Sequence, residues 1–300
     1  MFFTSSALFA VQLETNFPLS SFDVANNTKK VVGVGPGIGG SFFNVGGGNR
    51  YQLTDTFEKQ AVAMWYSIPI DLSQDFEFDF KLYFDSGRAY TIWNSMPGDA
   101  DGIAFVMHAM PFDNMENIIG SGQRYLGYGY FNDGLFDEVN GYEIIPQSLI
   151  SPSYAVEFDT DYDLNWELPP NNYGWVNAQP NQQAQHISYL KNASSYAQSG
   201  TYVPIQNDWS GEVTNQHWYC VSIVWKRVNG VNGDAGYTLT TYLEERTTGE
   251  MVQRVSKPFS SPSDLIDNIT IDEDGHFYAY WGITASTCAT PNRQMIEFQR

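Results

Sequence analysis

Alternation of apolar and polar residues dominates the hydrophobic pattern of this chain. Its clearest example spans residues 76–84, where the positions of one parity are all large and apolar: Phe76, Phe78, Phe80, Leu82 and Phe84. Successive side chains of an extended strand point to opposite faces, so this run predicts a strand with one buried face. No segment shows a sustained helical period, apart from a short turn expected at residues 263–266. The pattern predicts an all-β protein, a jelly-roll-type sandwich of two antiparallel sheets.

Further apolar or alternating runs predict more strands, at residues 103–107, 154–160, 186–190, 218–225, 237–243, 251–255 and 277–284. Asn-Gly pairs between residues 229 and 234 predict a hairpin turn. Residues 13–50, 111–127 and 192–208 show no clear element. The run Gly35–Gly40 satisfies the dinucleotide pattern GxGxxG, but the residues after it cannot begin a stable helix, so it is interpreted as a loop.

Composition narrows the classes of function. The 300 residues carry a net charge of −19, which argues against binding nucleic acid or an anionic membrane. No stretch is long and apolar enough to span a membrane. Residues 1–20 are interpreted as an N-terminal segment, either a signal-peptide remnant or an edge strand, and residues 21–300 as a single domain. The 2 cysteines, Cys220 and Cys288, fit either a disulfide or two free thiols.

The candidate chemistry lies in an acidic strand. Glu157, Asp159 and Asp161 share one face of the run that begins at Tyr154. Like-charged carboxylates in a row repel one another unless a cation lies between them or one of them holds a proton. A third interpretation is that all three face water on an edge strand. The long polar segment from residue 164 to 185 and the histidine at 186 favour a site.

Four segments, taken in order, resemble the legume-lectin-like (L-type) lectins. These are Ala100–Val106 (ADGIAFV), Tyr125–Gly129 (YLGYG), Tyr154–Thr160 (YAVEFDT) and Tyr280–Thr287 (YWGITAST). The resemblance runs from about residue 40 to the C-terminus and is closest to bacterial secreted members, on the basis of Met64–Tyr66 and Pro69–Leu72. It implies a concanavalin-like fold and a secreted or cell-surface protein that binds an extracellular glycan or glycoprotein.

The resemblance also implies metal ligands. Carried onto this chain residue by residue, they are Glu157, Asp159, Asp161 through its carbonyl, Asp163, Asn181 and His186. Oxygen donors of this kind suit Ca²⁺. Asn181 stands where the family has an Asp, and a neutral ligand weakens the hold on a cation. A second, transition metal such as Mn²⁺ is therefore left open.

The sugar site implied by the family matches only in part. Asp101 corresponds to the carboxylate that accepts sugar hydroxyls, and the bond Ala100–Asp101 to a cis peptide. The other implied sugar-binding positions are Gly102, Arg124, Tyr125, Tyr162 and Asp163. Asp163 replaces an Asn and cannot donate hydrogen bonds when ionised. Asp161 replaces an aromatic platform, for which Tyr162 or Trp166 could substitute.

Two alternatives to a calcium-dependent lectin follow from the same residues. Laminarinase-like glycoside hydrolases share the sandwich architecture and carry catalytic carboxylates on one strand, which Glu157-x-Asp159-x-Asp161 resembles. The replaced Asn and aromatic residue also fit a structural or adhesive module with a vestigial sugar site. We expect no turnover. The sequence leaves the sugar, the oligomeric state and the source undetermined.

Overall fold

The structure is a computed structural model. It describes residues 29–34, 49–57, 60–85, 102–120, 122, 126–129, 150–160, 186–192, 201–204, 218–229, 235–245, 250–287 and 292–298.

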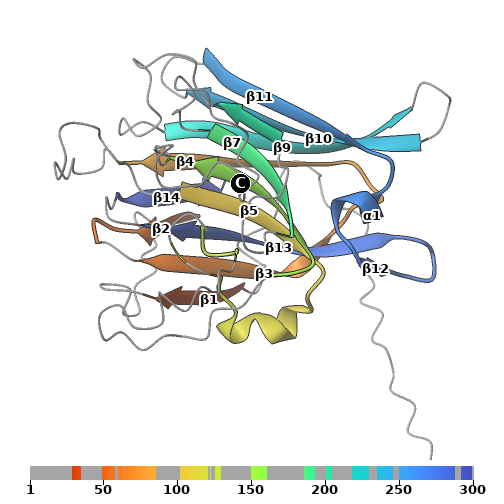
Figure 1. The fold of residues 1–300 in the computed structure, drawn as a ribbon, viewed down its shortest axis with the longest axis horizontal. Helices are drawn as coiled ribbons and strands as arrows, with labels where there is room; N and C mark the ends of the chain where they lie inside the picture. The colour runs from red at the N-terminus through yellow and green to blue at the C-terminus, as the bar shows by residue number, and fades with distance from the viewer. Residues whose placement is uncertain are drawn as a thin grey trace, which may run out of the picture.

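The larger sheet has eight strands and carries the acidic strand near its middle (Figure 1). Its order is β1 (Lys29–Val34), β3 (Ala61–Asp71), β13 (Phe277–Ser286), β5 (Gly102–His108), β6 (Ser153–Asp159), β7 (His186–Lys191) and β8 (Thr201–Pro204), with β12 (Thr270–Ile271) paired to β13. All of these pairings are antiparallel. Strand β13 comes late in the chain, yet it lies inside this sheet rather than at its edge.

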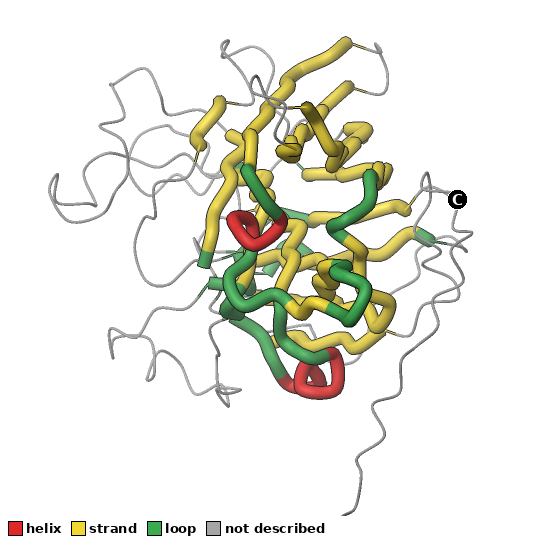
Figure 2. The backbone as a smooth tube through the Cα atoms, turned by 90° about the vertical axis from the view of Figure 1, so that its right-hand side faces the viewer, coloured by secondary structure: helices red, strands yellow, loops and turns green. Residues whose placement is uncertain are grey.

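The smaller sheet has six strands, again all antiparallel. Its order is β11 (Glu250–Phe259), β10 (Ala235–Glu245), β9 (Trp218–Asn229), β4 (Phe76–Phe84), β14 (Gln294–Phe298) and β2 (Arg50–Thr54). The short helical segments η1 (Phe112–Asn117) and α1 (Pro262–Leu265) lie at separate places on this framework of strands (Figure 2). The described fold is thus an antiparallel sandwich with almost no helix.

The main core lies between the two sheets. The predicted inward residues of β4 are all buried there: Phe76, Phe78, Phe80, Leu82 and Phe84. On the eight-stranded sheet, Tyr66 stacks on its cross-strand partner Trp281 with ring centroids 4.1 Å apart. Across the core, Phe78 of the other sheet meets the Trp281 ring edge-on at 5.0 Å. Burying an aromatic side chain of this size stabilises the fold by about 1.5–3 kcal/mol relative to leaving it exposed. The residues that the alternation predicted to be buried therefore form part of the main core.

A second apolar layer covers the outer face of the eight-stranded sheet. Trp65 and Val106 on the strands are packed under Met115 of η1, Ile119 and Leu126. The Trp65 indole Nε1 donates to the Ile118 carbonyl at 2.8 Å, which ties the covering segment to β3. Gly282 makes room for that indole, because a Cβ there would lie 2.2 Å from the Trp65 ring. Both faces of this part of the sheet are therefore dry.

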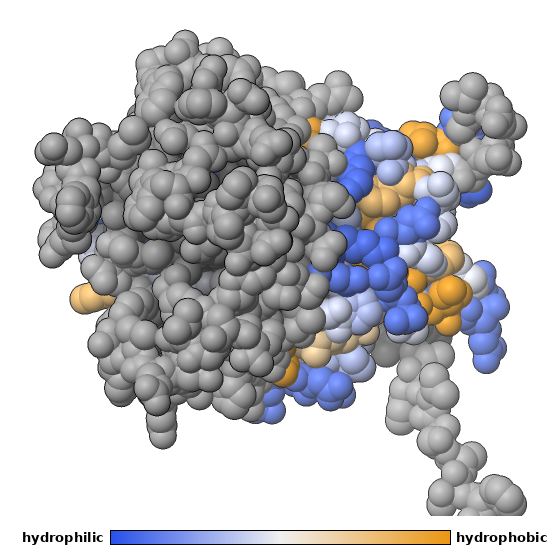
Figure 3. All heavy atoms as spheres, viewed as in Figure 1, coloured by the Kyte–Doolittle hydropathy of each residue, from blue (hydrophilic) through white to orange (hydrophobic). Residues whose placement is uncertain are grey.

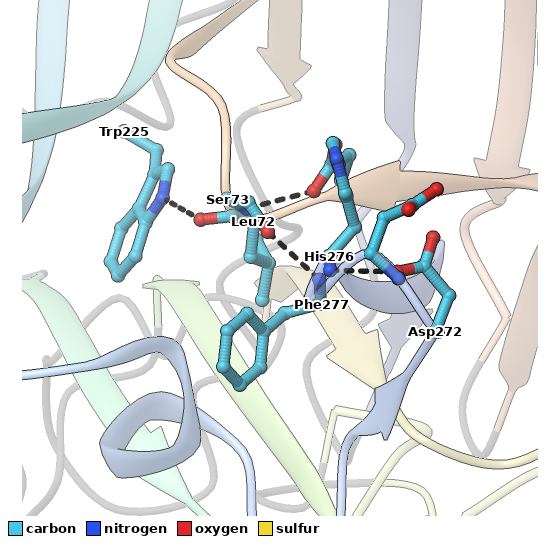
Figure 4. Close-up of polar contacts among 8 residues, drawn as sticks. Leu72, Ser73, Trp225, Asp272, His276 and Phe277 are labelled. Atoms are coloured by element: carbon cyan, nitrogen blue, oxygen red, sulfur yellow. Dashed lines mark hydrogen bonds and ion pairs between the residues drawn. The ribbon is translucent and has the colours of Figure 1, made fainter.

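A polar joint closes one end of the sandwich (Figure 4). The Leu72 amide donates to the Phe277 carbonyl at 2.7 Å, and the Trp225 indole of the other sheet donates to the Leu72 carbonyl at 2.8 Å. His276 Nδ1 lies 2.6 Å from Asp71 Oδ2, and this carboxylate raises the pKa of His276. The joint links the β3–β4 turn both to β9 and to the turn between β12 and β13.

The surface of the described residues carries no broad apolar patch on the side drawn in Figure 3, where hydrophobic areas are small and separate. The large apolar side chains that are exposed, Phe57, Val228 and Ile271, lie on different elements. No helix among the described residues is both long enough and apolar enough to cross a membrane.

The all-β, concanavalin-like jelly-roll sandwich expected from the sequence is confirmed, as is the short turn at α1. Several predicted loops were wrong in part. Strand β1 lies within residues 13–50, η1 within 111–127 and β8 within 192–208. Strand β1 precedes the GxGxxG run but pairs antiparallel with β3, so it is not the first strand of a dinucleotide-binding unit. The run itself, residues 1–20 and Cys288 lie outside the described residues.

Candidate functional site

The acidic strand β6 alternates as predicted. Val156 and Phe158 point into the main core, while Glu157 and Asp159 point to the outer face of the eight-stranded sheet. Both carboxylate residues are only 6% exposed. The interpretation that they face water on an edge strand is therefore wrong, because β6 lies between β5 and β7 and its outer face is covered.

The pairing of the strands brings other predicted site residues to the same end of the sheet. Asp159 is the Cα partner of Gly102 on β5 and of His186 on β7. Residues directly opposite each other in a sheet share a face. Gly102 has φ of +133°, and a Cβ there would lie 2.2 Å from the Phe158 carbonyl oxygen. Glycine therefore lets β5 bend close to β6 beside Asp159.

Glu157 is held by two hydroxyl groups. The Tyr128 hydroxyl donates to Oε1 at 2.5 Å, and the Ser188 hydroxyl donates to Oε2. Ser188 comes from the neighbouring strand, where it is the Cα partner of Glu157. Hydrogen bonds to an ionised acceptor are stronger than bonds between neutral groups. This arrangement fixes the Glu157 side chain in one orientation.

Tyr128 belongs to the glycine-rich segment 126–129, which lies on the outer face of the sheet. Leu126 and Gly127 have positive φ, of 49° and 77°, and a Cβ at Gly127 would lie 3.0 Å from the Val62 carbonyl oxygen. Glycine at 127 thus lets the segment touch the sheet backbone. The ring of Tyr128 is buried, and burial together with the negative charge of Glu157 raises the pKa of its hydroxyl well above the usual range. The hydroxyl therefore stays a donor.

The opposite end of the same outer face carries a different polar pair. His108 and Ser153 are Cα partners, both fully buried. Neither His108 ring nitrogen nor Ser153 Oγ has a hydrogen-bond partner among the residues that the structure describes. Burial lowers the pKa of His108 to about 3, against a smaller raising effect of the Met110 backbone, so the ring is neutral near pH 7. The covered face therefore contains a neutral histidine whose protonation at low pH would be unfavourable in the folded state.

The structure describes only part of the predicted site. It places Glu157, Asp159, Gly102 and the backbone of His186 together at one end of the outer face. The remaining predicted residues lie outside the described ranges: Ala100, Asp101, Arg124, Tyr125, Asp161, Tyr162, Asp163, Trp166 and Asn181. Within the ranges described, no three His, Cys, Asp or Glu side chains are arranged to hold a metal ion.

Asp159 and Glu157 are the described oxygen donors of the predicted metal site. Asp159 lies at the end of its strand, and hard oxygen donors of this kind suit Ca²⁺. Glu157 accepts one hydroxyl hydrogen bond on each oxygen, which orients the carboxylate and leaves each oxygen a further acceptor site.

Sequence reasoning missed Tyr128 and Ser188. Ser188 lies two positions after His186, so strand alternation alone could have placed it on the same face. No sequence signal links Tyr128 to Glu157, because the contact depends on how the segment folds back onto the sheet.

No protein-family model and no curated protein match this sequence. Solved structures do match. A winged bean acidic lectin in complex with methyl-α-D-galactose is 16% identical, with a TM-score of 0.49 and coverage of 90% of this chain and 96% of the lectin. The Ca²⁺- and mannose-bound exoplasmic/lumenal domain of VIP36 is 12% identical, with a TM-score of 0.42 and coverage of 91% and 83%. A legume lectin-like domain from Entamoeba histolytica is 14% identical, with a TM-score of 0.39 and coverage of 92% and 91%.

These structures are legume lectins and legume-lectin-like domains, the group that the sequence motifs also resemble. The closer similarity to bacterial secreted members is not supported. At identities of 12–16% and TM-scores below 0.5, the matches define neither a ligand nor a site for this chain.

Proposed function

We propose that this protein is a calcium-dependent carbohydrate-binding module of a secreted or cell-surface protein, without enzymatic turnover. The pairing of Gly102 with Asp159 is the observation that carries the proposal. Asp101, the candidate sugar acceptor, directly precedes Gly102 in the sequence, and Asp159 is the first candidate calcium ligand. In this proposal, the sugar residue and the cation strand would be neighbours through the pairing of β5 with β6.

In this proposal, Ca²⁺ is held by Asp159, the carbonyl of Asp161 and Asp163, which supply hard oxygens in a short stretch of chain. Asn181 and His186 complete the candidate ligand set, and Mn²⁺ is not part of the proposal. Bound calcium would order the chain that follows Asp159. It would also neutralise part of the negative charge beside Asp101.

The sugar would be bound by a carboxylate and an aromatic wall. Asp101 can accept two neighbouring hydroxyl protons, a pair that pyranose rings present. Arg124 and Asp163 would add polar contacts, and Tyr125 or Tyr162 would pack against the apolar face of the ring. The partner would be an extracellular glycan or glycoprotein.

The test is retention on a broad glycan array with calcium and with chelator. Asp101→Asn should abolish binding and leave calcium affinity nearly unchanged, because the amide removes one acceptor without touching the cation. Asp159→Ala should abolish both, together with the rise in Tm that a ligand specific for the folded state produces. Asp79→Asn on the outer face of the other sheet is the matched control and should change neither.

Two other results would replace the proposal. Release of reducing sugar from a β-glucan, lost in Glu157→Gln, would favour the laminarinase-like hydrolase, since Glu157 and Asp159 share one buried face. Failure to retain any glycan with calcium present would favour the structural or adhesive module.

A further inference from the structure

Glu157 stands where the sequence resemblance expects a metal ligand, yet its contacts are those of an anchor. Its two oxygens accept hydrogen bonds from Tyr128, which precedes it in the chain, and from Ser188, which follows it. Each oxygen keeps a further acceptor site, so these bonds orient the carboxylate without filling it. Neutral hydroxyl donors stabilise a carboxylate in place without a cation.

The two donors differ in what they attach. Ser188 lies on β7, which the sheet already holds next to β6. Tyr128 lies on the glycine-rich segment, where the Gly120 amide donates to the Gly127 carbonyl at 2.7 Å and the Ile150 amide donates to the Tyr128 carbonyl at 3.4 Å. The Tyr128 hydroxyl connects this covering layer to β6, as the Trp65 indole connects it to β3.

We propose that Glu157 anchors the glycine-rich segment 126–129 to β6 through Tyr128. This rests on the proposed function in one respect, since segment 126–129 follows the candidate sugar residues Arg124 and Tyr125. Glu157 then acts as a positioning residue for this segment.

The hydroxyl-specific test is hydrogen exchange at the Gly120 amide, measured by NMR. Tyr128→Phe keeps the ring and removes the donor, so opening of the segment should become easier and exchange about tenfold faster. Ser188→Ala removes the other donor to the same carboxylate but no link to the segment, and should change the rate less than about twofold. Equal rates in wild type and Tyr128→Phe, or equal acceleration in both variants, would overturn the anchor.

Should Tyr128→Phe fail to fold, Glu157→Gln gives a second route. The amide keeps an oxygen acceptor but loses the negative charge. Exchange at the Gly120 amide should therefore accelerate by a smaller factor than the roughly tenfold expected for loss of the Tyr128 hydroxyl bond. Exchange unchanged in Glu157→Gln would overturn the proposal.

Calcium binding, followed as a rise in Tm, separates the anchor from the proposed function. Protein that binds no Ca²⁺ would overturn the proposed function, while the acceleration in Tyr128→Phe would still support the anchor.

Discussion

The two faces of the eight-stranded sheet are both dry, but they are made dry in different ways. The inner face carries large residues such as Phe105 and Trp281, which pack against the strands of the other sheet. The outer face carries many small ones, including Ala63, Ala104 and Gly282. Large side chains of the segments that fold over this face pack against them. The inner face follows from strand alternation, whereas the outer face depends on contacts between distant parts of the chain.

The largest effects are expected when one buried side chain on each face is truncated to alanine. Phe78→Ala in the main core should lower the free energy of unfolding by about 3–5 kcal/mol, because the cavity is closed on all sides. Met115→Ala in the outer layer should lower it by about 2 kcal/mol or more if that layer is packed as a core. Denaturant unfolding measures both. A loss below about 0.5 kcal/mol for Met115→Ala would show that the outer layer is only a loose cover.

The next effect is a dependence on pH that arises only on the outer face. His108 has a pKa of about 3 when folded and of about 6.5 when unfolded, so the unfolded chain binds the proton more tightly. Its contribution to stability is fully present above pH 6.5 and is lost as the pH falls toward 3. Between pH 8 and pH 5 the loss should be about 2 kcal/mol.

His108→Phe should remove this loss, as measured by urea unfolding at several pH values. His276 serves as the control of opposite sign. Asp71 raises the pKa of His276, so its contribution is present below the unfolded value and is lost as pH rises through the folded one. If the free energy of unfolding of His108→Phe still falls between pH 8 and pH 5, a group other than His108 causes the loss.

The smallest effect is expected on the outer face of the six-stranded sheet, where Glu297 pairs with Lys81 at 2.5 Å and with Arg50. These groups are partly exposed, and solvent screens them. Glu297→Gln should change the free energy of unfolding by less than about 1 kcal/mol, and less still at high salt. A larger effect that is insensitive to salt would mean that this face is also covered.

The sequence was sufficient for most of the framework. The alternation at residues 76–84 and 154–159 placed Phe78, Val156 and Phe158 in the core and Glu157 and Asp159 on the other side. It failed at β1, β8 and β14, which are short and carry no distinctive pattern. Strands of this kind are held by their neighbours rather than by their own composition.

The candidate site could be predicted only along the strand. Spacing indicated that Glu157 and Asp159 share a face, but not that the carboxylate of Glu157 is held by hydroxyls. Tyr128 reaches it from 29 residues away, through a segment with two left-handed residues. Contacts of that kind depend on the path of a loop, which local propensity does not determine.

The late strands β13 and β14 have a consequence for how the protein is made. β13 lies between β3 and β5, and β14 between β4 and β2, although both come from the last part of the chain. While a ribosome synthesises the chain from its N-terminus, neither sheet can be completed until residues 277–298 have emerged. The earlier strands then wait with their apolar faces and edges unpaired, a stage that favours aggregation and the need for chaperones.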